Sequence, residues 1–131
     1  MLKRVKIHQK RIILQFYVQG NYLDMFCYNR SQDTFLGVPF NIASSSLLQM
    51  IIAKATGLIP RYFNLSMGDT HIYESHIDVV KEQLSRVPYK FPEITITNEL
   101  NTVEDIEKLV YEDFSLSEYI YHPSIKAKMI A

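Results

Sequence analysis

The sequence predicts a single α+β domain, and three of its features support that prediction. Two runs rich in β-branched and aromatic residues, at 11–18 and 22–30, are joined by a short Gly-Asn connection, as in a β-hairpin. An apolar segment with a helical period follows at 42–56, and shorter strand and helix patterns come after it. No internal repeat, low-complexity tract or interdomain linker interrupts the chain, so we expect residues 1–131 to form one domain.

The predicted hairpin strands carry apolar residues on both faces, which is typical of the centre of a sheet that is covered on each side. The helix at 42–56 follows Asn41, a suitable N-cap, and stops at Gly57, a suitable C-cap. Lys54 is its only charged residue. We therefore expect this helix to be buried around most of its circumference.

Shorter elements are predicted in the second half of the chain. Residues 58–63 form a connector, residues 64–73 a third strand, and residues 75–86 an amphipathic helix. Ser75 is the candidate cap of that helix, and Ile77, Val80 and Leu84 occupy its core side. A strand at 93–97, a short acidic helix at 102–110 and a strand at 114–120 precede a largely irregular tail at 122–131.

The formal net charge is +0, but basic residues gather at the start of the chain. Five of the 14 basic residues lie within the first 11 positions, which hold no acidic residue, so nine basic and 14 acidic residues remain elsewhere. Such a basic segment can bind nucleic acid, but this one has no interleaved aromatic residues. A solvated terminus is therefore the preferred interpretation.

Composition excludes several classes of protein. The hydrophobic content of 47% and the charged content of 21% are values of a globular chain rather than a disordered one. The apolar runs are too short to span a bilayer, and no signal peptide is recognisable. Cys27 is the lone cysteine, so no disulfide framework exists and we expect a reducing cytoplasm.

Three candidate chemistries have plainer alternatives. Asp69, His71 and His76 lie close enough in sequence to suggest a metal site, but no fourth ligand is evident and a satisfied polar cluster is the preferred reading. Cys27 could act as a nucleophile, although a thiol within an apolar strand is more commonly buried and inert. The turn at Gly37 has one glycine and does not form a phosphate-loop pattern.

A polar set at the ends of the apolar elements has the chemistry of a nucleotide site. Arginine forms bidentate hydrogen bonds with phosphate, asparagine offers a donor and an acceptor to a base edge, and histidine and tyrosine can bond a sugar hydroxyl. Caps and loop hydrogen bonds could use the same residues, so spacing alone leaves both readings open. The set consists of Arg30, Ser31, Asp33, Asn41, His71 and Tyr73.

The segment RSQDTFLGVPFNIAS, together with GDTHIY and HPSIKAKM, resembles the thymidylate synthase family. Members of that family methylate dUMP with methylenetetrahydrofolate in nucleotide biosynthesis. The resemblance runs over residues 15–131, whereas residues 1–14 form a divergent basic segment. It implies an α+β sandwich of a mixed β-sheet and helices, truncated here, and a homodimer that packs sheet to sheet.

The resemblance also implies roles for individual residues. Arg30 would hold the dUMP phosphate with help from Ser31, Asn41 would read the pyrimidine edge, and His71 and Tyr73 would bond the deoxyribose hydroxyl. Related dCMP hydroxymethylases have an aspartate in place of this asparagine, so uracil is the expected base. The implied folate-binding residues are Asp33, Leu36, Gly37, Phe40 and Ala131, and no metal is implied.

The departures from the family concern catalysis. The family's nucleophile is the cysteine of a Pro-Cys-His motif, whose position here falls on Lys10, and no such motif occurs in the chain. In a second alignment Lys10 and Arg11 replace an arginine pair that reaches the partner's phosphate, which makes Arg11 a further candidate dUMP ligand. The family's amino-terminal half, with its arginine loop and its glutamate, has no counterpart, and smaller departures occur at Asn29 and Met67.

These observations predict a thymidylate synthase-like protein that is inactive alone and is at most a weak dUMP binder. Two alternatives remain: the carboxy-terminal subunit of a split synthase, or an interaction module that modulates a full-length synthase. Either a homodimer or a partner chain of the same family would cover the sheet and helix surfaces left open.

Overall fold

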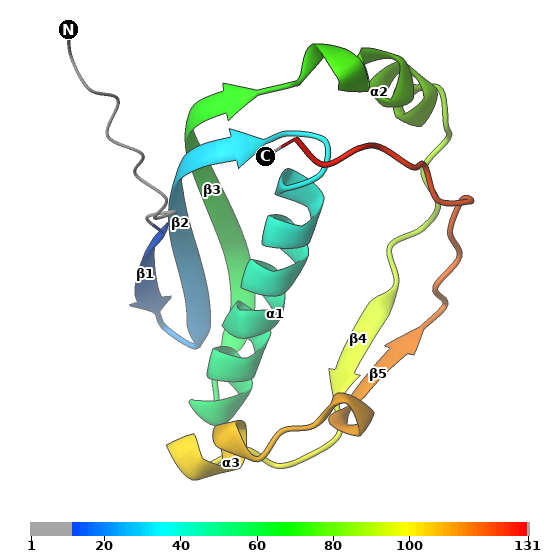
Figure 1. The fold of residues 1–131 in the computed structure, drawn as a ribbon. Helices are drawn as coiled ribbons and strands as arrows, with labels where there is room; N and C mark the ends of the chain where they lie inside the picture. The colour runs from blue at the N-terminus through cyan, green and yellow to red at the C-terminus, as the bar shows by residue number, and fades with distance from the viewer. Residues whose placement is uncertain (1–11, 131) are drawn as a thin grey trace, which may run out of the picture.

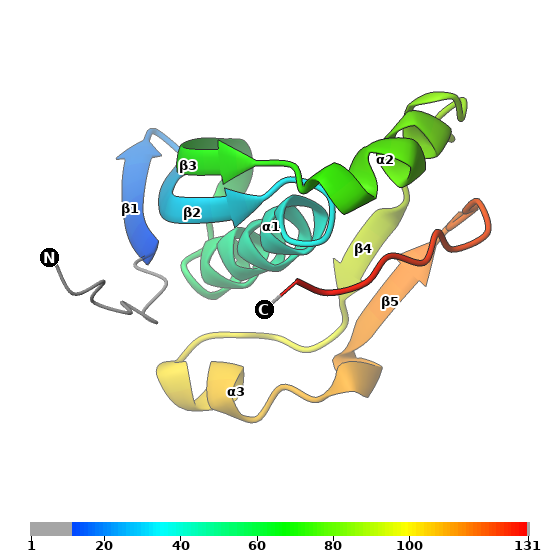
Figure 2. The same ribbon diagram turned by 45° about the horizontal axis from the view of Figure 1, so that its top comes forward.

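The computed structural model describes residues 12–130, which form three layers (Figure 1). The first layer is a mixed sheet with the order β1-β2-β3, built from β1 (Ile12–Gln19), β2 (Tyr22–Asp33) and β3 (Ile59–His71). Helix α1 (Val38–Ala55) runs along one face of this sheet. A ribbon of β4 (Glu93–Ile96) and β5 (Phe114–Ser117) lies on the other side of α1 (Figure 2). The predicted α+β class is confirmed.

The predicted β-hairpin is also confirmed. β1 pairs with β2 in antiparallel register from Ile12 opposite Asn29 to Gln19 opposite Tyr22. Gly20, the first of two turn residues, has a φ of 59°, which a residue with a side chain rarely adopts. β2 continues to Asp33, three residues beyond its predicted end.

β2, α1 and β3 form a crossover unit that sets the position of the candidate site. β2 and β3 pair in parallel, which requires a long connection, and α1 provides it. The carboxyl ends of both strands consequently lie at the same end of the sheet, beside the beginning of α1 (Figure 1). The predicted connector at 58–63 is wrong for most of its length, because β3 begins at Ile59. Pro60 is compatible with this strand because it lies on the edge of the sheet.

Helix α1 begins earlier than predicted. Its N-cap is Gly37, and Pro39 lies in the first turn, where a fixed φ suits the helix and an N–H is not needed. Asn41 is therefore inside the helix, and its predicted role as the N-cap is wrong. At the other end the N–H groups of Gly57 and Leu58 donate to the carbonyls of Lys54 and Ala53, at 3.2 and 2.8 Å. This is a Schellman ending with Gly57 at a φ of 67°, so the prediction that Gly57 terminates the helix is confirmed.

The sheet is covered on one face only within the described part of the chain. Leu23, Met25 and Cys27 of β2 are buried, whereas the intervening Phe26 is 43% exposed. Every residue of β1 is exposed, because α1 packs against β2 and β3. The expectation of a sheet covered on both faces is therefore wrong here. The expected burial of α1 is wrong as well, because only Gln49 and Ala53 among its residues are fully buried.

Gln49 anchors α1 to the sheet with a buried amide. Its Nε2 donates to the carbonyl of Leu23 in β2 at 2.8 Å and to that of Tyr62 in β3 at 3.0 Å. The pairing of β2 with β3 shifts register between Leu23 and Met25, where ladder hydrogen bonds are interrupted. The Gln49 amide thus donates to carbonyl groups beside this irregularity. The apolar pattern of the helix did not predict these hydrogen bonds.

Shorter elements complete the chain. α2 (Ile77–Leu84) follows a 3-10 turn, η1 (Glu74–His76), so Ser75 lies in that turn and does not cap the helix. Ile77 and Leu84 are exposed, which makes their predicted core positions wrong. α3 (Val103–Glu107) is capped by the Thr102 side chain, and a second 3-10 turn, η2 (Tyr111–Asp113), precedes β5. The two short strands, the acidic helix and the irregular tail are confirmed, with pairing of β4 to β5.

Among the described residues, no helix is both long enough and apolar enough to cross a bilayer.

Candidate functional site

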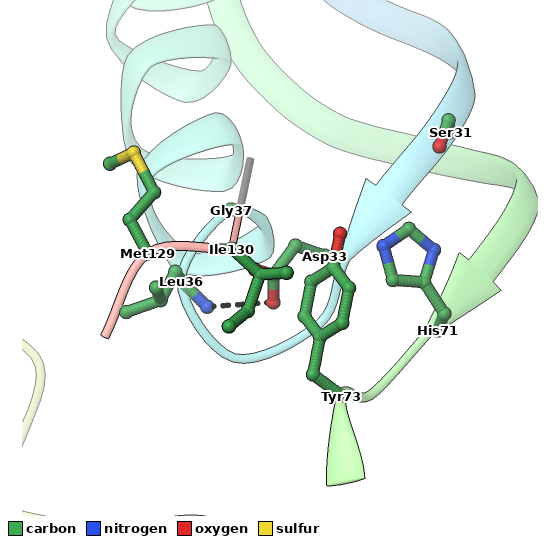
Figure 3. Close-up of a pocket in the computed structure, with 8 residues that line it drawn as sticks. All are labelled: Ser31, Asp33, Leu36, Gly37, His71, Tyr73, Met129 and Ile130. Carbon is green, nitrogen blue, oxygen red and sulfur yellow. Dashed lines mark hydrogen bonds between the residues drawn. The ribbon is translucent and has the colours of Figure 1, made fainter. Parts of the chain in front are cut away.

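A cavity of about 300 Å³ lies where the ends of β2 and β3 meet the start of α1 and the carboxy-terminal tail (Figure 3). Strand β2 and the loop after it contribute four of its lining residues, β3 and the residue pair beyond it contribute two, and the tail contributes two. The lining residues are Ser31, Asp33, Leu36, Gly37, His71, Tyr73, Met129 and Ile130. The topology thus brings together segments that are almost 100 residues apart in the chain.

Asp33 organises the loop between β2 and α1. One carboxylate oxygen, Oδ1, accepts the N–H groups of Phe35 and Leu36 at 3.0 and 3.1 Å (Figure 3 draws the second bond). The N–H of Gly37 donates to the Asp33 carbonyl at 2.9 Å. A Cβ at Gly37 would lie 2.9 Å from that same carbonyl oxygen, so the loop closes this tightly only with glycine. The loop is consequently fixed by its own hydrogen bonds.

His71 and Tyr73 form one wall of the cavity. Their rings meet edge to face with 5.0 Å between centroids, and both side chains are half-buried (Figure 3). The carbonyl of His71 accepts the N–H of Thr34 at 2.9 Å, which ties the end of β3 to the loop after β2. The Nδ1 atom of His71 lies 3.9 Å from a carboxylate oxygen of Asp69. Two groups that can donate or accept hydrogen bonds therefore border the space.

His76 connects the tail to this wall. Its side chain is only 1% exposed, and its Nε2 atom lies 2.8 Å from the carbonyl oxygen of Lys128. The ring also contacts Tyr73 and Phe35, at centroid distances of 5.5 and 5.7 Å. The hydrogen bond between His76 and the Lys128 carbonyl places the next residue, Met129, at the cavity. His76 was predicted only as a metal ligand or a member of a polar cluster, and its role in holding the tail was not predicted.

The metal alternative finds no support in residues 12–130, where no group of three or more histidine, cysteine, aspartate or glutamate side chains could hold an ion. Cys27 is fully buried, as the plainer reading predicted, and its thiol lies 3.6 Å from the Asn29 side-chain oxygen. Burial raises the pKa of the Cys27 thiol, which disfavours the thiolate and with it nucleophilic attack.

The structure does not bring every predicted site residue to the cavity. Arg30 is exposed on β2, Phe40 is 75% exposed at the start of α1, and Asn41 points its amide at Gln32; none of the three lines the space. Arg11 and Ala131 lie outside the described residues, as does Lys10. Six of the predicted residues therefore share the cavity, and three lie close to it in sequence.

Comparison with known proteins supplies the family. The family profile described as "Thymidylate synthase" matches residues 2–131. The chain is 46% identical over 115 residues to a thymidylate synthase of Mycoplasma mobile. This alignment covers 88% of the chain and 39% of that protein. It is 43% and 42% identical over 130 residues to bifunctional dihydrofolate reductase-thymidylate synthases of Leishmania amazonensis and Leishmania major.

Each of these Leishmania alignments covers 98% of the chain but only 24% of the relative. The chain thus spans well under half the length of these relatives. Its match to the family nevertheless extends over almost the whole sequence, including the segments that form the cavity. The chain belongs to the thymidylate synthase family.

Proposed function

We propose that this chain is a thymidylate synthase-like protein of dTMP biosynthesis that binds dUMP weakly and does not transfer the methyl group by itself. One observation carries the proposal: Ser31, Asp33, His71 and Tyr73 border a single cavity in a chain that is 46% identical to a thymidylate synthase. A cytoplasmic location, where the nucleotide and the folate would be available, belongs to the same proposal.

The cavity and its surroundings offer the groups that a nucleotide needs. His71 and Tyr73 would bond the sugar hydroxyl, and Ser31 would meet the phosphate together with the exposed guanidinium of Arg30. A charge-assisted hydrogen bond of this kind contributes about 2 kcal/mol. Asn41 would read the uracil edge. Because none of the described residues that line the cavity is a lysine or an arginine, we expect weak affinity.

Methylenetetrahydrofolate would bind on the side of the cavity formed by the loop after β2. Leu36 and Gly37 line that side, Phe40 is exposed next to it, and Ile130 approaches it from the tail. Asp33 would face the pterin, although its Oδ1 atom already accepts two backbone N–H groups. The exposed Phe40 ring is a suitable surface for a flat heterocycle.

Catalysis by the chain alone is not expected. Methylation of uracil in this family starts with attack of a cysteine thiolate on C6, and the aligned residue here is Lys10. Cys27 cannot supply the thiolate, since it is buried and its thiol pKa is raised by that burial. Loss of a covalent nucleophile typically lowers the rate by several orders of magnitude.

A second candidate is the carboxy-terminal subunit of a split synthase, and the uncovered sheet favours it. Phe26 and Tyr17 are exposed on the face away from α1, and no strand of the described residues pairs with the outer edge of β1. A second copy of this chain or a partner of the same family could cover these surfaces. The same surfaces are compatible with an interaction module that joins and modulates a full-length synthase.

Calorimetric titration with dUMP tests the binding proposal. We expect saturable heat from the wild type, weaker binding by Arg30→Ala, and loss of preference for dUMP over dCMP in Asn41→Asp. Lys108→Ala removes an exposed cation of the distant α3 region and serves as the matched control. Equal dUMP affinity in the wild type and in both site variants would end the proposal.

Tritium release from labelled dUMP in the presence of methylenetetrahydrofolate tests the catalytic part. The isolated chain should release none above background. Release that appears only after co-expression with a candidate amino-terminal half would favour the split enzyme, whereas turnover by the isolated chain would refute the claim of inactivity.

A further inference from the structure

Gln32 is a buried amide in the middle of the site-bearing segment. It lies between the cavity residues Ser31 and Asp33 on β2, and only 2% of it is exposed. Its Oε1 atom accepts a hydrogen bond from Nδ2 of Asn41 at 2.7 Å, across the loop that joins β2 to α1. Its Nε2 atom is buried and has no hydrogen-bond partner among the described residues. A buried polar group left partly unsatisfied is costly, so its retention calls for a reason.

The hydrogen bond fixes the direction of the Asn41 amide. With one Nδ2 hydrogen donated to Gln32, the Oδ1 atom and the second Nδ2 hydrogen remain for another partner. Water cannot easily replace Gln32 as the acceptor, because the glutamine side chain is buried. With the Gln32 amide in its observed orientation, rotation of the Asn41 amide by 180° would set its oxygen against the Gln32 side-chain oxygen, which is repulsive. Only rotation of both amides together would keep a hydrogen bond between them, so the orientation of the Asn41 amide is coupled to that of Gln32.

We propose that Gln32 is a positioning residue for base selection, holding Asn41 in the orientation that matches uracil and mismatches cytosine. This inference rests on the proposed binding of dUMP. The N3–H of uracil would donate to Oδ1 of Asn41, and O4 would accept the second Nδ2 hydrogen. Cytosine presents an acceptor at N3 and an amino donor at C4, so the same orientation opposes acceptor to acceptor and donor to donor.

Substitutions at Gln32 separate this role from simple filling of space. Gln32→Met keeps the length of the side chain, and its thioether is only a weak hydrogen-bond acceptor. We therefore expect the ratio of dUMP to dCMP affinity to fall about tenfold, the effect of one lost orienting hydrogen bond. Gln32→Glu keeps an acceptor oxygen at the same place and should restore the ratio to near that of the wild type. Any repulsion of the phosphate by the new carboxylate affects both nucleotides and cancels in the ratio.

Gln83→Met is the matched control, since Gln83 is exposed on α2 and should leave the ratio unchanged. The affinities would be measured by calorimetry with dUMP and dCMP on the full chain. An unchanged ratio in Gln32→Met, or an equal loss in Gln32→Met and Gln32→Glu, would overturn the inference.

A second measurement does not depend on any nucleotide. The side-chain amide protons of Asn41, followed by ¹⁵N NMR on the free chain, should exchange with water at least tenfold faster in Gln32→Met than in the wild type and in Gln83→Met. If they do so while no nucleotide binds the wild type, the proposed function fails and the positioning of Asn41 stands. If they are unaffected, the positioning role is refuted even where dUMP binds.

Discussion

Gly68 is the residue whose substitution most directly tests how β2 and β3 set the geometry of the site. A Cβ at this position would lie 2.7 Å from the carbonyl oxygen of Arg30 and 2.9 Å from the hydroxyl of Tyr28. Carbon and oxygen atoms in close contact are normally about 3.3 Å or more apart, so the two strands would have to separate by roughly 0.6 Å. The Tyr28 hydroxyl can move away, but the Arg30 oxygen belongs to the backbone.

We therefore expect Gly68→Ala to lower the free energy of unfolding by about 1–3 kcal/mol, the usual cost of inserting a methyl group into tightly packed structure. Urea unfolding followed by circular dichroism would measure this loss. Because Ser31 pairs with Asp69 directly beside the strained position, dUMP affinity should fall as well. Thr70→Ala, an exposed change on the same strand, is the control and should stay within about 0.5 kcal/mol.

If Gly68→Ala unfolds at the same urea concentration as Thr70→Ala, the close approach of β3 to the Arg30 carbonyl does not exist in solution. The parallel pairing of β2 with β3 would still bring Ser31 and His71 together, so the site would then not depend on this close contact.

Three further predictions concern stability. Gln49→Met should lower the free energy of unfolding in urea by about 2–4 kcal/mol, because two carbonyl groups lose a buried donor. A loss below about 0.5 kcal/mol would contradict the role of Gln49 in anchoring α1. Gly57→Ala should cost about 1–2 kcal/mol through its positive φ alone, since a Cβ there meets no atom within 4 Å; an unchanged midpoint would refute the helix ending. Hydrogen bonds from Arg61 hold the pKa of Asp24 below its ordinary value. The stabilisation by these hydrogen bonds is present above the ordinary pKa of an aspartate and is lost as pH falls through the lowered pKa of Asp24. The stability difference between the wild type and Arg61→Met should therefore shrink on acidification. A difference that stays constant would contradict the pairing.

Much of the fold followed from local chemistry that the sequence displays openly. Glycine at a hairpin turn and glycine after an apolar helix both mark positive φ, and both positions were located correctly. The errors arose where two local signals competed. Asn41 resembles an N-cap, but Pro39 two residues earlier suits a first turn, and the structure follows the proline. Residues 58–63 were predicted to be a connector, but β3 begins at Ile59, and its edge position is compatible with Pro60.

Burial was the least predictable property. Periodicity identifies apolar residues but does not tell which of them another element covers, so Leu84 and the residues of β1 were expected to be buried and are exposed. Contacts across the chain were equally invisible. Nothing in the residue spacing indicates that the His76 ring forms a hydrogen bond with the Lys128 carbonyl, or that Gln32 accepts one from the Asn41 amide. Both hydrogen bonds depend on how segments meet that are separated in the chain by many residues or by a loop.

The candidate site, too, was predicted only in part. Its residues were chosen from their chemistry and from resemblance to a family, and six of them line one cavity. Met129 and Ile130 were not among the predicted residues, although the tail motif that contains Met129 was part of the resemblance.

NMR mapping of dUMP on the full chain is the measurement that tests the central claim most directly. With backbone amides assigned, titration should shift the signals of Ser31, Asp33, His71 and Tyr73 together, with one common dissociation constant between about 10 μM and 1 mM. The signals of β4 and β5, on the far side of α1, should stay in place. No shift at millimolar dUMP, or shifts confined to that distant ribbon, would contradict the assignment of this cavity as a nucleotide site.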